Sequence, residues 1–109
     1  SKSVTINGHN VIKLTEAPDF TMLRDAATML QREAENLVIA AALELEGKAQ
    51  LLLMYSHDLV AAGKNAGADI REAAKYIQGG GGGQPGLAMA GGKNVAGLGE
   101  AMQKLLEKI

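Results

Sequence analysis

Cysteine and tryptophan are absent from this 109-residue sequence, and phenylalanine and tyrosine together contribute only three residues. Without cysteine the chain can form neither disulfides nor thiolate metal sites, which suits a reducing compartment such as the cytoplasm. With so few aromatic side chains, a stacking platform for single-stranded nucleic acid is not expected. The longest apolar run, LVIAAAL at 37–43, is far shorter than the roughly 20 residues that span a bilayer. We therefore expect no contact with a membrane.

Residue patterns typical of catalytic or metal sites are also scarce. The two histidines, His9 and His57, stand alone, with no second histidine or cysteine at the spacing of a metal site. His57 is followed by Asp58, but on a predicted strand two adjacent residues point to opposite faces. Ser56 lacks the G-x-S-x-G context of a hydrolase nucleophile. We expect neither a catalytic residue nor a metal ligand in this chain.

Charge and glycine are unevenly distributed. The formal net charge is −1, which argues against strong general affinity for polyanions. Residues 1–62 hold five Lys/Arg against eight Asp/Glu, whereas residues 63–109 hold six against four and carry twelve of the fourteen glycines. An anion-binding face is therefore expected in the second half. The alternative is that this difference is scatter among solvated surface charges.

The hydrophobic pattern predicts a single α/β domain over residues 1–109. An Asn7-Gly8 turn predicts a strand or small hairpin at the start, and Asp19 is a candidate N-cap for an amphipathic helix. Two apolar runs around 46–48 predict a pair of strands buried on both faces, in preference to a helix over 39–45. The helical stripe of the first helix comprises Leu23, Ala27, Leu30 and Ala34, and the methionines expected in core stripes are Met22, Met29, Met54, Met89 and Met102.

Two further helices are predicted around a glycine-rich stretch. The first ends near Gly79, and the second begins near Asn94 and keeps its apolar spacing to Ile109. The expected fold is thus a small mixed β-sheet covered by helices, in the order strand, helix, strand, strand, helix, glycine loop, helix.

The stretch QGGGGGQPGLAMAGGKN at 78–94 poses the main functional question. It lacks the G-x-x-x-x-G-K-[ST] pattern of a nucleotide-binding loop and follows a helix, unlike a dinucleotide fingerprint. Two interpretations stay open: a flexible linker, or bare backbone that approaches a sugar-phosphate chain closely. The candidate binding residues are Lys64, Arg71, Lys75, Gly79, Gly80, Gly81, Gly82, Gly83, Gln84, Lys93 and Asn94.

The segments KAQLLLMYSHDLV and AGADIREAAKYIQGGGGGQPGLAMAGGKN together resemble the C-terminal domain of bacterial alanyl-tRNA synthetase, the DHH-associated C-Ala type. The resemblance covers nearly the whole chain. It implies a non-catalytic domain, taken from a longer chain, that binds the outer corner of alanine tRNA and links aminoacylation with editing. By the same resemblance, the ATP, magnesium and zinc sites lie in other parts of the ligase, so this chain needs no cofactor.

Two alternatives remain. The chain could dock on the remaining domains of the synthetase or on a second copy of itself, through an exposed apolar patch at Leu87, Met89 and Ala90. It could also be the substrate-binding appendage of a DHH phosphoesterase. Those relatives place a histidine directly after their glycines, where this chain has Gln84, so the synthetase interpretation is preferred.

Overall fold

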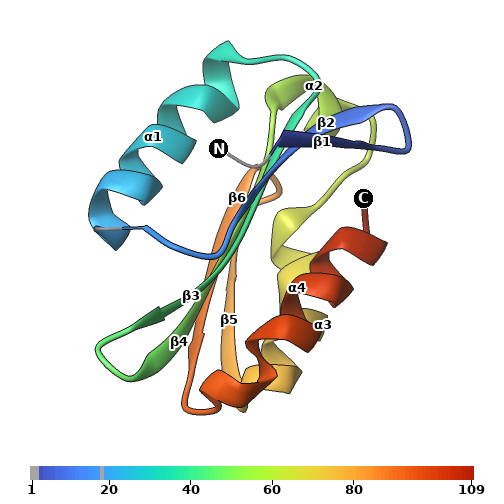
Figure 1. Cartoon of the computed structure of the whole chain (residues 1–109). Helices are drawn as coiled ribbons and strands as arrows, with labels where there is room; N and C mark the ends of the chain where they lie inside the picture. Colours follow the sequence, from blue (N-terminus) through green and yellow to red (C-terminus); the bar gives the residue numbers. More distant parts are fainter. Residues whose placement is uncertain (1–2, 18) are drawn as a thin grey trace.

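The computed structural model, which describes residues 3–17 and 19–109, shows a six-stranded mixed sheet with helices on both faces (Figure 1). The elements are β1 Ser3–Ile6, β2 His9–Leu14, α1 Phe20–Glu33, β3 Leu37–Leu45, β4 Lys48–Tyr55, α2 His57–Ala61, α3 Ala66–Ala74, η1 Lys75–Ile77, β5 Gly79–Gly83, β6 Leu87–Gly92, η2 Val95–Gly97 and α4 Leu98–Glu107. The elements η1 and η2 are single-turn 3₁₀ helices that follow α3 and β6. In the sheet the strands lie in the order β1-β2-β3-β4-β6-β5.

Two tight turns set the first half of the sheet. The β1–β2 turn has φ values of 52° at Asn7 and 80° at Gly8, and the β3–β4 turn has 54° at Glu46 and 79° at Gly47. Positive φ at both central residues matches the twist of antiparallel strands. The predicted hairpins are confirmed at both places. β2 and β3 run parallel, so the chain must cross over between them, and α1 is that crossover.

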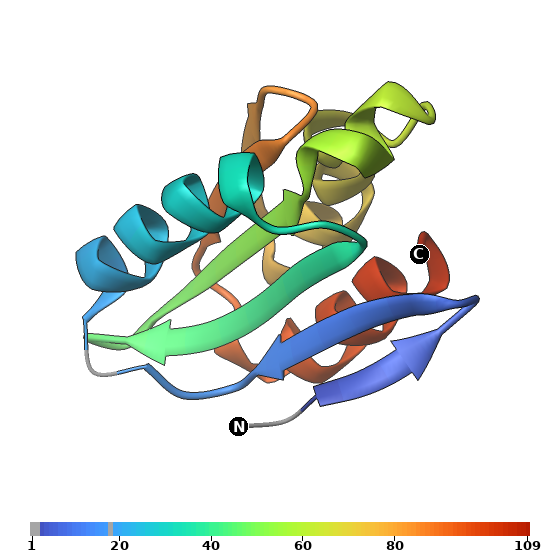
Figure 2. The ribbon, with the colours of Figure 1, turned by 90° about the horizontal axis from the view of Figure 1, so that it is seen from above.

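The helix α1 begins as its sequence predicts. The Asp19 side chain accepts hydrogen bonds from the backbone N–H groups of Thr21, at 2.8 Å, and Met22, at 3.2 Å. Ala27 is fully buried, and Leu23 and Leu30 pack with it against the sheet. The predicted apolar stripe is therefore confirmed for Leu23, Ala27 and Leu30, whereas Ala34 is the extended C-cap after the helix. The helix α1 covers one face of the sheet (Figure 2).

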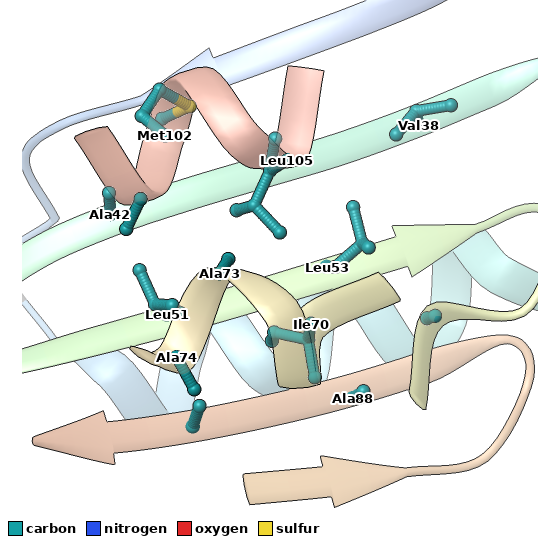
Figure 3. Packing of buried hydrophobic residues seen from close by; sticks show 14 of the residues in the cluster. Val38, Ala42, Leu51, Leu53, Ile70, Ala73, Ala74, Ala88, Met102 and Leu105 are labelled. Atoms are coloured by element: carbon teal, nitrogen blue, oxygen red, sulfur yellow. The ribbon is translucent and has the colours of Figure 1, made fainter. Parts of the chain in front are cut away.

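The central strands are buried on both faces, as predicted. On the α1 side the buried residues are Ala27, Ile39, Ala41, Leu43, Leu52 and Met54. On the other side α4 lies over β3 and α3 lies over β5 and β6, closing a larger core (Figure 3). Its members include Val38, Ala42, Leu51, Leu53, Ile70, Ala73, Ala88, Met102 and Leu105.

The glycine run is the main correction to the expected order. Residues 79–83 form the strand β5, antiparallel to β6, so the predicted glycine loop and flexible linker are both wrong. Glycine has low strand propensity and carries no side-chain pattern, so nothing in this run signals a strand. The short helix α2 was also missed, and it places His57 at its first residue, not on a strand. The last helix starts after η2, at Leu98.

The methionine prediction holds only in part. Met54 and Met102 are buried, and Met89 is half-buried. Met22 and Met29, by contrast, are 67% and 50% exposed on the outer face of α1, so the expectation that they belong to the core was wrong.

Candidate nucleic-acid interface

The glycine strand β5 is the edge strand of the sheet and pairs only with β6. Glycine is required at alternate positions because the β6 backbone lies where a side chain would begin. A Cβ atom on Gly79 would collide with the carbonyl of Gly91, and one on Gly81 with the carbonyl of Met89. At Gly80, in contrast, a Cβ atom would meet nothing within 4 Å. At Gly82 it would make only ordinary contacts with Arg71, at 3.6 Å and beyond. Packing thus explains Gly79 and Gly81 and leaves Gly80 and Gly82 unexplained.

Helix α3 lies close over the strand and brings a basic side chain to it. A Cβ on Gly67 would come within 2.7 Å of the carbonyl oxygen of Gly83, so α3 also needs a small residue at this contact. One turn later, the Arg71 guanidinium reaches over the strand, with its Nε 3.6 Å from the position of a Cβ on Gly82. The structure therefore brings Arg71 and the glycines together.

Three main-chain hydrogen bonds fix the β5–β6 turn. The Gln84 N–H donates to the carbonyl of Leu87 at 3.0 Å, and the Ala66 N–H at the start of α3 donates to the carbonyl of Pro85 at 2.8 Å. The Tyr55 N–H donates to the carbonyl of Gly86 at 3.0 Å. The turn is thus tied to two neighbouring elements, and it leaves the side chain of Gln84 exposed.

Two of the predicted lysines lie at the beginning of the glycine strand. Lys75 is exposed on η1, just before β5. Lys93 is exposed directly after β6, and Gly92 pairs with Gly79 at the start of β5. The structure also adds Lys48, which the sequence did not single out. Ala49 pairs with Gly92, so Lys48 and Lys93 occupy adjacent strand ends. Recognising β6 as a strand was the signal needed to find this neighbour.

The remaining two polar candidates make internal contacts. The Lys64 ammonium donates to the carbonyls of Lys108, at 2.8 Å, and Ile109, at 3.1 Å, and lies 5.7 Å from the centre of the Tyr55 ring. The Asn94 side chain donates to the carbonyl of Tyr76 at 3.0 Å. Both residues join elements of the fold through these hydrogen bonds.

A buried tyrosine anchors α3 beside this surface. The Tyr55 hydroxyl donates to the Asp69 carboxylate at 2.5 Å, and Tyr55 is fully buried. Burial, assisted by the adjacent carboxylate, raises the pKa of Tyr55 far above its usual range. The phenol therefore stays protonated and keeps donating this hydrogen bond.

A second polar cluster lies at the end of β4 and joins it to β2 and β3. The buried Ser56 hydroxyl donates to Asp58 at 2.6 Å, and Asp58 accepts from the Asn36 N–H at 3.0 Å. The hydrogen bond from Ser56 and that from Asn36 lower the pKa of Asp58. His9 Nδ1 lies 2.6 Å from Asn36 Oδ1. The Ser56 hydroxyl is fully buried and already donates to Asp58, so this cluster connects β2, β3 and the end of β4.

The apolar patch expected at Leu87, Met89 and Ala90 is not present as an exposed surface. The three residues belong to β6, where Ala90 is 4% exposed and faces α3 and α4. Leu87 and Met89 pack against the cluster under α1. The three residues therefore do not form one exposed apolar patch, because Ala90 lies on the opposite side of the sheet from Leu87 and Met89.

Within residues 3–17 and 19–109, no three His, Asp or Glu side chains are grouped so as to hold a metal ion. No helix in these ranges has the length and apolar character needed to cross a membrane.

Comparisons with known proteins agree with the fold. The family model of the DHHA1 domain matches residues 8–109. An alanine–tRNA ligase from Bacteroides thetaiotaomicron is 47% identical over 103 residues, covering 94% of this chain and 12% of that protein. The corresponding enzyme from Acetivibrio thermocellus is 36% identical over 110 residues, covering 100% of this chain and again 12% of the relative.

The chain thus spans only a small part of the curated relatives that it matches. Among solved structures, the C-Ala domain of Aquifex aeolicus alanyl-tRNA synthetase superposes with a TM-score of 0.83 and 28% identity, covering 99% of this chain and 97% of that one. The chain belongs to the DHHA1 domain family, in the form represented by the C-Ala domain of alanyl-tRNA synthetase.

Proposed function

We propose that this chain is the non-catalytic tRNA-binding domain of an alanine–tRNA ligase and contacts the outer corner of alanine tRNA through β5 and its basic surroundings. The names of the relatives support the ligase over a phosphoesterase appendage. In this proposal the ATP, magnesium and zinc chemistry belongs to other domains of a cytoplasmic enzyme, and the chain holds one tRNA for both aminoacylation and editing.

The observation that carries the proposal is the open position at Gly80. The fold requires glycine at Gly79 and Gly81, yet a side chain at Gly80 would meet nothing in the domain. A glycine that packing does not require is explained if a ligand must approach the backbone there. Folded RNA is recognised mainly by shape and by its sugar-phosphate surface, which a flat edge of bare backbone fits.

The charges around β5 agree with a phosphate-bearing ligand. Arg71 lies beside Gly82, and Lys75 and Lys93 lie close in the chain to the paired residues Gly79 and Gly92, where β5 begins. Because the whole chain has a net charge of −1, attraction for a polyanion depends on a local excess of positive charge such as this one. We therefore expect modest affinity with a clear dependence on salt.

The test is a titration of the purified chain with alanine tRNA, an unrelated tRNA and a plain RNA duplex, each at two salt concentrations. Gly80→Val is the informative variant, because it adds bulk to the exposed strand without an internal clash. We expect it to weaken tRNA binding by about tenfold or more, as for a central contact in an interface. Thr5→Val, on the opposite edge strand β1, is the matched control. Unchanged binding by Gly80→Val would remove β5 from the interface.

Charge reversal tests the basic surroundings separately. The double variant Lys75→Glu and Lys93→Glu should weaken tRNA binding and lower the slope of log affinity against log salt by about one for each lysine lost. Arg24 lies on α1, on the opposite side of the sheet from α3. Arg24→Glu should therefore leave the tRNA affinity and its salt dependence unchanged. Equal effects of the two charge reversals would mean that the attraction is general and not located at β5.

A further inference from the structure

The outer side of α3 and α4 carries a group of charged side chains that the proposed contact at β5 uses only at its margin. The two helices pack against each other on the same side of the sheet (Figure 1). The Glu72 carboxylate of α3 lies 2.6 Å from the ammonium of Lys108, at the end of α4. Lys104 stands one turn before Lys108, and Lys75 follows Glu72 by three residues. We call Lys75, Lys104 and Lys108 the lysine cluster.

All three lysines act on the one carboxylate. The hydrogen bond and the charge of Lys108, with smaller contributions from Lys104 and Lys75, lower the pKa of Glu72. Lys104 has a second acidic neighbour, Glu107, at 3.2 Å. The three lysines still outnumber these two carboxylates. Glu72 therefore occupies a position where the potential of the chain favours an anion.

The acidic side of α4 limits this surface in one direction. A shallow hollow of about 180 Å³ adjoins Lys104 and is lined by Tyr76, Glu100, Gln103, Lys104 and Glu107. Its two carboxylates repel a phosphate. An anionic ligand is therefore expected on the side of Lys104 that faces Glu72 and Lys75.

The lysines are held in place, whereas their carboxylate partner is accessible. The side chains of Lys104 and Lys108 are only 28% and 29% exposed, so their stems lie against the protein and restrict where the ammonium groups can go. The Lys64 ammonium donates to the carbonyl of Lys108 at 2.8 Å, which fixes the backbone there. The Glu72 side chain is 48% exposed, and an ion pair so open to solvent is weak.

The lysine cluster continues the basic surface of β5. Lys75 belongs to both, because η1 leads directly into β5. Arg71, four residues before Lys75, reaches over Gly82 of the strand. A carboxylate and a phosphodiester each carry one negative charge and offer two acceptor oxygens, so one can replace the other on an ammonium group. A sugar-phosphate chain lying on β5 could therefore extend over α3 to the end of α4.

We propose that the lysine cluster is a second phosphate contact for the RNA, and that a phosphate displaces Glu72 from Lys108 when the RNA binds. In the free chain Glu72 holds the cluster in place and weakens RNA binding, because its ion pair must first be exchanged. This inference rests on the proposed function and adds a contact for the same ligand. A phosphate contact carries no sequence information, so it strengthens the binding of every tRNA alike.

The test is a titration with alanine tRNA and with an unrelated tRNA, at several salt concentrations. Glu72→Gln keeps the shape of the side chain and removes its charge. We expect it to raise both affinities by roughly three- to tenfold and to steepen the salt dependence by about one in the slope of log affinity against log salt. Glu33→Gln is the matched control, because it makes the same change in net charge on an exposed residue of α1, across the sheet.

Lys108 is tested in combination with Glu72. Lys108→Gln alone should weaken tRNA binding, and the double variant with Glu72→Gln should bind no more tightly than the original chain, because the freed ammonium is the source of the gain. A gain in the double variant equal to that of Glu72→Gln would overturn the role of Lys108. Urea titration of each variant shows that the changes in affinity do not reflect unfolding.

Poly-glutamate is the competing probe. If Glu72→Gln strengthens its binding as much as that of tRNA, the surface suits an acidic protein segment and the RNA contact is overturned. If the original chain binds tRNA and Glu72→Gln binds it no more tightly than Glu33→Gln does, the Glu72 pair is an ordinary surface salt bridge and the inference is overturned, while β5 remains the contact.

The variant at Gly80 separates this inference from the proposed role of β5. A gain in Glu72→Gln together with unchanged binding by Gly80→Val would remove β5 from the interface and leave the lysine cluster as the contact. tRNA binding by none of the variants would overturn both.

Discussion

The hairpins β3–β4 and β5–β6 lie side by side in one sheet but are held together in different ways. β3 and β4 are rich in alanine and leucine, and most of their side chains are buried, on both faces of the sheet. β5 has no side chains at all and is positioned by close contact with the backbone of β6 and by α3. In the first hairpin, burial of large side chains contributes the stability. In the second, the lack of side chains on β5 allows the close backbone contact that contributes the stability.

The two regions should therefore respond to substitution in opposite directions. Removing atoms from β3 or β4 leaves a cavity, which is destabilising in proportion to its volume. Adding atoms to β5 forces its backbone away from β6, except where the space is open. Four changes, from the largest expected effect to the smallest, test this contrast.

Leu53→Ala in β4 should have the largest effect. Leu53 is fully buried among residues of α3, α4 and β6, so its truncation removes apolar contacts and leaves a cavity (Figure 3). We expect a loss of about 2–5 kcal/mol in the free energy of unfolding, measured by urea titration. Leu45→Ala, at the half-buried end of β3, is the control and should cost clearly less.

Tyr55→Phe tests the residue that joins the two hairpins. The variant keeps the ring but loses the hydrogen bond to Asp69, at an expected cost of about 1.5–3 kcal/mol near neutral pH. Because the pKa of Tyr55 is raised in the folded state, its contribution is complete below about pH 10, where unfolded tyrosine begins to ionise, and is lost above it.

Stability measured between neutral pH and alkaline pH should therefore fall less steeply in the phenylalanine variant than in the original chain. Tyr76 is exposed and present in both proteins, so it serves as the internal reference. An identical alkaline decline in the two proteins would mean that the Tyr55 hydroxyl does not control it.

Gly81→Ala adds one methyl group to β5 where the carbonyl of Met89 and the Cα of Ala90 already lie. The edge strand must shift, and we expect a loss of about 1–3 kcal/mol by chemical denaturation. A neutral result would show that β5 adjusts freely and that its pairing with β6 adds little.

Gly80→Ala is the matched substitution at the neighbouring position. The added methyl group meets nothing, and the alanine restricts the unfolded chain, so we expect a gain of about 0.4–1 kcal/mol. The same denaturation experiment compares it with Gly81→Ala. Equal effects of the two variants would contradict the assignment of separate roles to alternate glycines.

Elements with a side-chain pattern could be predicted from the sequence, and the glycine strand β5 could not. The apolar runs at 37–55, the Asp19 cap and the stripe of Ala27 and Leu30 each carry a side-chain pattern, and the structure confirms them. β5 has no such pattern, and its neighbour β6 is too rich in alanine and glycine to be read as a strand by itself. Both become strands because β4 offers an edge for pairing, which is a tertiary effect.

The sequence predicted which basic residues lie near the glycines, but it did not predict the contacts that each residue makes in the fold. Arg71, Lys75 and Lys93 were expected near the glycines and lie there. Lys64 and Asn94 satisfy main-chain carbonyls instead, a role that depends on the position of α4 and η1. Lys48 was missed because its proximity to Lys93 exists only through the pairing of β4 with β6.

The position of α4 has a consequence for the order in which the domain folds. This last helix packs on β3, more than fifty residues earlier in the chain, and Ile109 beyond it is 4% exposed. Until α4 docks, the side of β3 that bears Ala40 and Ala42 has no cover. Amide hydrogens of β3 should therefore gain their full protection from exchange only late in folding, after the hairpin with β4 has formed.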